Sequence, residues 1–144
     1  NDRIHSNVYD SSSYGRLQLL GQALQNLKVL PDYKTAYITI TEAEKAANNF
    51  KKGDTEGVVN YALYVAGIVM AAIFIEDKEQ NLIKISFRSK GSFSVNQFSR
   101  ENFSGGGHDN AAGGKSLLSM AETVEKFISL LPENKEKLVT SYEE

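Results

Sequence analysis

The apolar segment at residues 58–75 constrains the fold more than any other part of this 144-residue chain. It is about as long as the shortest helix that can span a membrane. However, Asn60 and Gly67 interrupt it, its second half is rich in β-branched side chains, and four charged residues follow it at 76–79. A short buried helix followed by a buried strand fits this pattern better than a membrane span. We therefore predict a core strand here and no association with a membrane.

Apolar residues that recur every three or four positions predict helices elsewhere in the chain. We expect helices at residues 14–30, 41–50, 58–64, 94–103 and 117–131. The serines at 11–13 are suitable N-caps for the first helix, and capping-box patterns at 41–44 and 119–122 begin the second and the last. Pro132 is expected to end the last helix and to leave a charged tail at residues 132–144.

Strands are expected at residues 33–40, 68–75 and 82–88, and the charged residues between the last two predict a hairpin turn. In the segment at 82–88, three apolar side chains alternate with Lys84, Ser86 and Arg88. Successive residues of a strand face opposite sides of the sheet. One face of this strand is therefore expected to pack in the core, while the other carries two cations.

Composition excludes several classes of function. The chain has no cysteine, which removes disulfide frameworks, thiolate zinc sites and cysteine nucleophiles, and which fits a reducing compartment. Two histidines are too few for a histidine-rich metal site. The net charge of −2 and the pI of about 5.8 argue against non-specific coating of nucleic acid, which needs a basic surface. The hydrophobic and charged fractions, 41% and 24%, are those of an ordinary globular domain.

The most unusual local feature is a glycine-rich run, with five glycines in the ten residues 105–114. Glycine costs conformational entropy on ordering, so such a run indicates a close approach of the backbone or positive φ angles. One interpretation is an anion-binding nest of backbone N–H groups, with His108 as a further donor and Asn110 in support. The other is a flexible surface loop. The run matches neither the dinucleotide fingerprint nor the P-loop.

Two further polar segments are candidates for a site. Arg88 and Ser89, followed by Lys90, end the amphipathic strand, and an arginine is suited to bidentate recognition of phosphate. A solvated strand end is the alternative for this segment. Asp54 and Thr55 begin the second segment, where a cap at a helix start is favoured over a cation site because no third ligand lies nearby in the sequence.

The Arg-Ser pair at 88–89 lies about twenty residues before Gly-Gly-Gly-His-Asp-Asn-Ala-Ala-Gly at 105–113. This combination resembles the DHHA1 domain, the C-terminal substrate-binding domain of DHH-family phosphoesterases. The segment at 53–61 is similar to the nanoRNase and pAp-phosphatase branch. The resemblance covers residues 14–131 and implies an α+β fold, with a mixed β-sheet of about five strands flanked by helices.

The resemblance also implies a division of labour. An N-terminal DHH domain of the same parent chain, missing from this sequence, would hold two Mn²⁺ ions and all catalytic residues, and residues 1–13 would be a remnant of the linker. This chain contains no Asp-His-His sequence, so no catalytic residue and no metal ligand is expected in it. Its role would be to position the substrate in a cytoplasmic enzyme. The residues implied are Arg88, Ser89, Gly105, Gly106, Gly107 and His108, with Asp54, Thr55, Lys90 and Asn110 as possible support.

Several alternatives remain open at this stage. Short oligoribonucleotides, pAp and linear dinucleotides such as pApA are all compatible with the motifs. A non-catalytic module that binds tRNA or a single strand is the alternative function, although the acidic pI argues against it. In a third interpretation the glycines only form a turn in a structural or dimerisation domain. The sequence does not decide between a monomer and a homodimer.

Overall fold

The computed structural model describes residues 13–141. Residues 1–12 of the expected linker at 1–13, with two of the three capping serines, and residues 142–144 at the end of the tail lie outside the described residues. A six-stranded sheet with the order β1-β2-β3-β4-β6-β5 forms the centre of the molecule. The strands are β1 (Lys28–Leu30), β2 (Thr35–Ile40), β3 (Met70–Asp77), β4 (Leu82–Ser89), β5 (Gly106–His108) and β6 (Ala111–Ser116). Among the strands in residues 13–141, only β2 and β3 pair in parallel, so the predicted mixed sheet is confirmed, with one strand more than about five.

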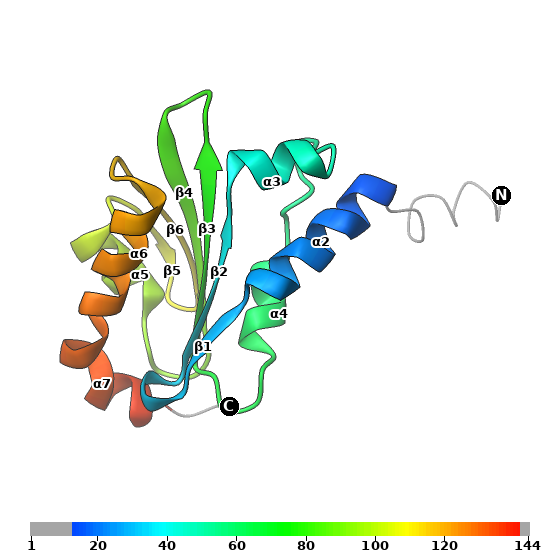
Figure 1. Ribbon diagram of the computed structural model, residues 1–144. Coiled ribbons are helices and arrows are strands. Elements are labelled where there is room, and N and C mark those ends of the chain that lie inside the picture. The colour runs from blue at the N-terminus through cyan, green and yellow to red at the C-terminus, as the bar shows by residue number, and fades with distance from the viewer. Residues whose placement is uncertain (1–12, 142–144) are drawn as a thin grey trace, which may run out of the picture.

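Helices cover both faces of this sheet. Figure 1 shows α2, α3 and α4 on one side and α5, α6 and α7 on the other. The helices are α2 (Tyr14–Asn26), α3 (Glu42–Ala47), α4 (Val59–Leu63), α5 (Val95–Asn102), α6 (Met120–Ser129) and α7 (Leu131–Val139), with a 3-10 turn η1 (Pro31–Tyr33). No helix in residues 13–141 is long and apolar enough to cross a membrane. The apolar segment at 58–75 instead contributes α4 and most of β3, as predicted.

The predicted N-terminal caps are confirmed. The Ser13 hydroxyl accepts a hydrogen bond from the Arg16 backbone N–H at 3.0 Å and begins α2. Both reciprocal hydrogen bonds of the capping box are present at the start of α3 and at the start of α6. These short local patterns place the helix starts correctly because cap and helix lie within one turn of each other.

Several helix ends differ from the sequence prediction. The first helix stops at Asn26, and the edge strand β1 precedes Pro31. α3 stops at Ala47 rather than near Phe50. Pro132 does not end the helical structure: it lies in the first turn of α7, where its missing N–H needs no partner. The supposed tail is therefore largely helical, and Leu138 within it is fully buried.

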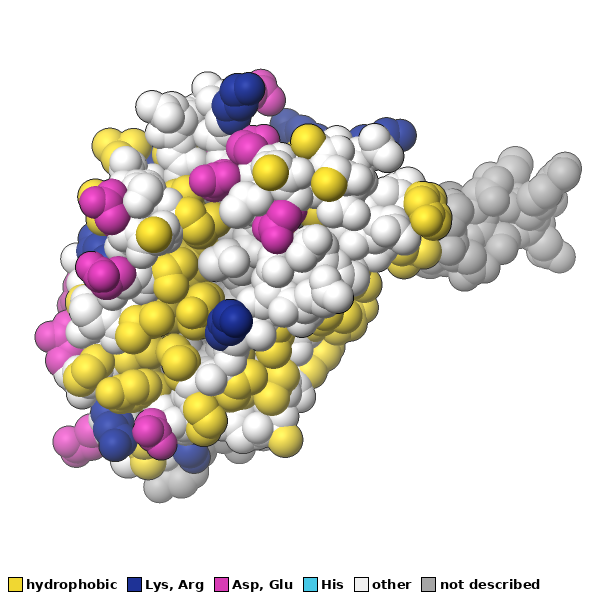
Figure 2. Space-filling model, viewed as in Figure 1, with side chains coloured by type: hydrophobic (Ala, Val, Ile, Leu, Met, Phe, Trp, Pro, Cys, Tyr) yellow, Lys and Arg dark blue, Asp and Glu magenta, His cyan; other side chains and the backbone are white. Residues whose placement is uncertain are grey.

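Two apolar layers lie on opposite faces of the sheet. The layer under α5, α6 and α7 is built around six buried phenylalanines: Phe74, Phe87, Phe93, Phe98, Phe103 and Phe127. The Phe74 and Phe127 ring centroids are 5.2 Å apart in an edge-to-face arrangement. The layer under α2 and α4 is aliphatic and contains Leu19, Ala23, Ala36, Ile38, Ile40, Ala71 and Ile73. Figure 2 shows that apolar side chains also gather on the surface around the sheet edge formed by β1.

Candidate functional site

The alternation in β4 separates the core from a polar face. Ile83, Ile85 and Phe87 are buried in the phenylalanine layer, as predicted. Lys84, Ser86 and Arg88 face the other way, toward the side of α2 and α4. α2 packs on β2, and α4 packs on β2, β3 and β4. Farther along the same side, β6 and β5 present residues that are exposed or half-buried. We call this surface the open face; it comprises Lys84, Ser86, Arg88, His108, Ala111, Gly113 and Lys115.

The register of the sheet brings Arg88 and His108 together. Arg88 is the direct partner of Ala111 in β6, and Ala111 is the direct partner of His108 in β5. Directly opposed residues of antiparallel strands point to the same side. Neighbouring strands are about 4.7–4.9 Å apart, so the two backbones lie about 10 Å apart across the small Ala111 side chain. Two long side chains at this separation can reach one ligand above Ala111.

The positive charge of Arg88 is not paired with a carboxylate among the described residues. Their ion pairs within 4.0 Å are Lys45–Glu42 and Lys84–Asp77. The Arg88 Nη1 donates a hydrogen bond to the neighbouring Phe87 carbonyl oxygen at 2.9 Å. The side chain is half-buried, and His108 is exposed. Arg88 therefore retains donors that a phosphate group can occupy.

Ser89 lies on the opposite face of β4 and is 5% exposed. Its hydroxyl is 2.7 Å from the Phe93 carbonyl oxygen and 3.2 Å from the Asp109 carbonyl oxygen, and it accepts a hydrogen bond from Asn110 Nδ2 at 2.9 Å. Asn110 Nδ2 also donates to the Gly91 carbonyl oxygen at 3.2 Å. These bonds fasten the turn between β5 and β6 to the end of β4. They thereby fix His108 relative to Arg88.

The glycine-rich run forms a β-hairpin rather than a loop, with β5 and β6 joined by a two-residue turn. A Cβ atom on Gly105 would lie 2.0 Å from the Gly113 carbonyl oxygen, and Gly106 has a φ of 150°. The Gly107 N–H donates to Asn96 Oδ1 at 2.8 Å. The close packing of β5 against β6 and α5 thus requires glycine at 105. The N–H of Gly107 is engaged within the protein.

The supporting residues lie in two places. The Lys90 backbone bonds to Val69 and to the Ser141 hydroxyl beside the Arg88 end of the open face. Asp54 is 7% exposed, and its carboxylate accepts a hydrogen bond from the Lys51 backbone N–H at 2.8 Å, so it caps a local turn. Thr55 lines a groove of about 540 Å³ near the other end of the open face, together with Lys84 and others. Asp54 and Thr55 are therefore not grouped with Arg88 and His108.

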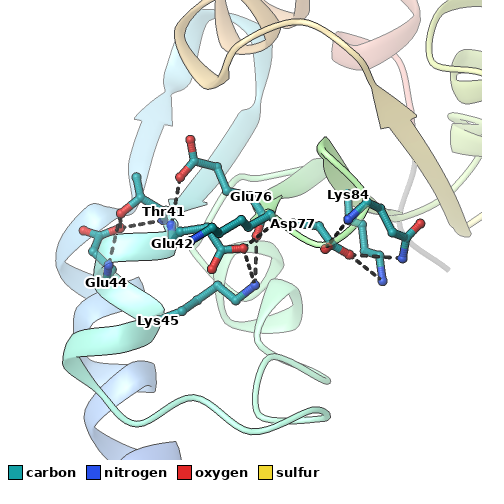
Figure 3. Close-up of polar contacts among 9 residues, drawn as sticks. Thr41, Glu42, Glu44, Lys45, Glu76, Asp77 and Lys84 are labelled. Atoms are coloured by element: carbon teal, nitrogen blue, oxygen red, sulfur yellow. Dashed lines mark hydrogen bonds and ion pairs between the residues drawn. The ribbon is translucent and has the colours of Figure 1, made fainter.

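A polar network that the sequence did not reveal fastens α3 to the β3–β4 hairpin (Figure 3). The Glu42 backbone N–H donates to Glu76 Oε1 at 2.8 Å, and Lys45 Nζ contacts Glu42 Oε2 at 3.1 Å and the Glu76 carbonyl oxygen at 2.9 Å. Lys84 Nζ lies 3.2 Å from Asp77 Oδ2. The only sequence signal for this network was the expected hairpin turn.

Two carboxyl groups of this network have lowered pKa values. Burial raises the pKa of Glu42, but the hydrogen bonds from the Lys78 backbone N–H and Lys45, with the charge of Lys45, outweigh it. The hydrogen bond from the Gln80 backbone N–H lowers the pKa of Asp77; burial opposes this, and Lys84 adds to it. Both groups are therefore stabilised as carboxylates in the folded protein.

The described residues do not fit a manganese site. No three His, Cys, Asp or Glu side chains in residues 13–141 are grouped so that they could hold a metal ion. Asp77 is engaged with Lys84 and the Gln80 backbone N–H, and Asp109, which follows His108, accepts a hydrogen bond from the Ser94 hydroxyl. The open face instead offers hydrogen-bond donors and positive charge, which are features of an anion site.

Comparison with known proteins places the chain in a family. A DHHA1 domain model matches residues 32–137. An exopolyphosphatase-related protein from Bacteroides fragilis is 41% identical, with a TM-score of 0.88 over 95% of this chain. A pGpG-specific phosphodiesterase from Vibrio cholerae has a TM-score of 0.59 over 84% of this chain at 17% identity, which shows a shared fold.

This chain spans 40% of the length of each of these two proteins. None of the curated proteins matches it. The Arg-Ser pair at the end of β4 and the Gly-Gly-Gly-His motif in the β5–β6 hairpin both lie within the region that the family model matches. The chain belongs to the DHHA1 domain family.

Proposed function

We propose that this chain is the substrate-recognition domain of a manganese-dependent DHH phosphoesterase and binds a nucleotide or short oligonucleotide by its phosphate. The observation that carries the proposal is the placement of Arg88 and His108 on either side of Ala111, in one row of the open face. Membership of the DHHA1 family supports it. A DHH domain of the same parent chain would hold the two Mn²⁺ ions, in a cytoplasmic enzyme.

Each residue of the site has a distinct part in this proposal. Arg88 holds the phosphate through its planar set of N–H donors, which match phosphate geometry. His108 adds a donor from the tip of the β5–β6 hairpin. Ser89 and Asn110 hold that tip in place, and Gly105 to Gly107 allow the hairpin backbone to lie close to β6. Short oligoribonucleotides, pAp and linear dinucleotides all present a terminal phosphate to such a site.

The proposal is tested by titrating pAp and pApA into the chain and following binding by calorimetry and by NMR of the His108 ring. Arg88→Ala and His108→Ala are each expected to weaken binding by about tenfold or more, since a hydrogen bond to a charged group contributes about 1.5–3 kcal/mol. Circular dichroism and thermal unfolding control for folding, and Lys135→Ala on α7 is a matched charge control. Unchanged affinity in both variants would show that phosphate is not bound here.

A non-catalytic module for tRNA or single strands is the second candidate. The observation that favours it is the presence of Lys84, Arg88 and Lys115 on one face despite the net charge of −2. Binding of a long nucleic acid through many phosphates would depend steeply on salt. Each phosphate contact contributes about 0.7–0.9 to the slope of the logarithm of the binding constant against the logarithm of the salt concentration. Titration of tRNA at several salt concentrations distinguishes the two candidates, because a site for one terminal phosphate has a shallow slope.

A further inference from the structure

The centre of the open face is a strip of small residues. Ser86 in β4 is the direct partner of Gly113 in β6, and the adjacent row contains Ala111. A Cβ atom added to Gly113 would meet nothing within 4 Å except the Ile85 carbonyl oxygen at 3.7 Å, and the φ of this glycine is not in the left-handed region. Neither packing nor backbone conformation therefore requires glycine at 113. Because Gly113 has no side chain, nothing protrudes from the surface at this position.

The far end of this strip is cationic. Lys84 and Lys115 are direct partners in the β4–β6 ladder. Like charges in this position repel, because the Cβ atoms of directly opposed residues are only about 4.5–5.5 Å apart. The Lys84 side chain is 54% exposed, and the carboxylate of Asp77 balances its positive charge. Lys115 is exposed and forms no ion pair among the described residues. An anion bound between them would relieve the repulsion.

The two cationic ends are separated by a neutral middle. Lys84 and Arg88 are four residues apart on one strand, which corresponds to about 13 Å. Ser86 and Gly113 lie between these two rows, and Ala111 separates Arg88 from His108; none of the three is charged. A polyphosphate chain carries negative charge on every unit and would be matched by cations along its whole length. An oligonucleotide has a neutral sugar and base between successive phosphates, so its charges are more widely spaced and fit cations that are separated by uncharged residues.

We propose that the open face is a two-ended subsite for a linear oligonucleotide. Arg88 and His108 hold the terminal phosphate, Lys84 and Lys115 hold a second phosphate of the same strand, and the intervening nucleosides lie over Gly113 and Ser86. The inference rests on the proposed function and deepens it, because it selects oligonucleotides over mononucleotides such as pAp. The groove lined by Lys84 and Thr55 continues the subsite toward the β3–β4 hairpin.

The test compares a 5′-phosphorylated tetraribonucleotide with adenosine 5′-monophosphate. The wild-type chain is expected to bind the tetranucleotide about tenfold more tightly. In the double variant Lys84→Ala/Lys115→Ala, this preference disappears and the affinity for the mononucleotide is unchanged. The logarithmic salt slope for the tetranucleotide is expected to fall by about 0.7 for the one phosphate contact that is lost. Lys135→Ala/Lys137→Ala on α7 is the matched control and leaves the preference intact.

A second variant tests the middle of the subsite, where no side chain protrudes above Gly113. Gly113→Leu adds a side chain into free space, so the fold is retained while tetranucleotide binding weakens by about tenfold or more. Gly21→Leu on α2, where an added Cβ also meets nothing within 4 Å, is the control for added bulk. Thermal unfolding confirms that both variants are folded.

The outcomes separate this inference from the proposed function. Equal, Arg88-dependent affinities for the two ligands would overturn the two-ended subsite and leave the proposed function in place. A preference that survives the double lysine variant would also overturn it. Tight binding of polyphosphate that depends on both lysines but is unaffected by Gly113→Leu would assign the face to polyphosphate instead. Absence of binding by either nucleotide would contradict the proposed function itself.

Discussion

Two halves of one sheet face have opposite properties although they share the same transverse rows. Ile73 in β3 is the direct partner of Ser86 in β4, and Ala71 is the direct partner of Arg88. Ile73 and Ala71 are buried beneath α2 and α4. One strand farther on, Ser86 and Arg88 border an exposed surface. Because α4 also contacts β4, the boundary between the core and the candidate site runs along β4, and the site is built on the extension of a rigid core.

The order of the strands explains this boundary. The helices on this side, α2 to α4, come from the first half of the chain and pack chiefly on β2 and β3. The hairpin of β5 and β6 is added beyond β4 late in the chain, and the helices that follow it, α6 and α7, pack on the opposite side (Figure 1). The binding residues are therefore held by strands rather than by long loops, which favours a fixed geometry.

The largest expected effect is a loss of stability in the half of the sheet face that α2 and α4 cover. Ile73→Ala is expected to reduce the free energy of unfolding by about 2–5 kcal/mol, because it creates a cavity in a closed layer. Ser86→Ala, in the same row, is expected to change it by no more than about 0.5 kcal/mol. Urea unfolding followed by circular dichroism measures both. Equal losses in the two variants would show that the open half is packed as tightly as the covered half.

Adjacent glycines of β6 sharpen the comparison across the sheet. Gly114→Ala would place a Cβ 2.7 Å from Ser99 Oγ and 3.0 Å from Phe103 Cβ, and this overpacking is expected to cost about 1–3 kcal/mol. Gly113→Ala faces free space and is expected to stabilise the protein by about 0.4–1 kcal/mol, since it restricts the unfolded chain. Thermal unfolding of the two variants decides this: shifts of the same sign would contradict the assigned faces.

A smaller effect concerns the attachment of the hairpin. Asn110→Ala removes the hydrogen bonds to the Ser89 hydroxyl and the Gly91 carbonyl oxygen and is expected to cost about 1 kcal/mol. It is also expected to weaken nucleotide binding, because His108 loses its fixed position relative to Arg88. Calorimetry on Asn110→Ala and Asn134→Ala, a control on α7, tests this. Unchanged affinity with lowered stability would limit Asn110 to a structural role.

The smallest expected effect concerns pH. The pKa values of Glu42 and Asp77 are lowered from 4.5 and 3.8 in the folded protein. Their contribution to stability is therefore complete above those values and is lost as the pH falls through the lower, folded values. Glu42→Gln is expected to be less stable than the wild type at pH 7 and to approach it near pH 3. A constant difference in melting temperature would show that the carboxylate charge is not involved.

Local patterns predicted much of this molecule. The alternation in β4 correctly assigned Ile83, Ile85 and Phe87 to the core and Arg88 to the other face. The capping boxes placed the starts of α3 and α6. The resemblance of two separate motifs to the DHHA1 family gave the fold class, which the family match and the sheet confirm.

Other features depend on contacts that are distant in the sequence. β1 has three residues and no periodic signal, and it exists because it pairs with β2. The glycine-rich run has low strand propensity, and it becomes a hairpin through packing against β4 and α5. The pairing of Lys84 with Lys115 follows only from the β4–β6 register. Pro132 predicts a helix end, but the sequence alone does not show that a second helix begins there.

Successive residues of β6 face opposite sides of the sheet, and this limits the sequence changes that the open face can accept. Ala112 and Gly114 face the phenylalanine layer, and Ala111, Gly113 and Lys115 face outward. Inserting or deleting one residue in β6 would exchange the two sets and place a lysine against Phe103. The length of this segment is therefore fixed by the interior as well as by the ligand. The surface can diversify by substitution at alternate positions, whereas changes in length are confined to the turns.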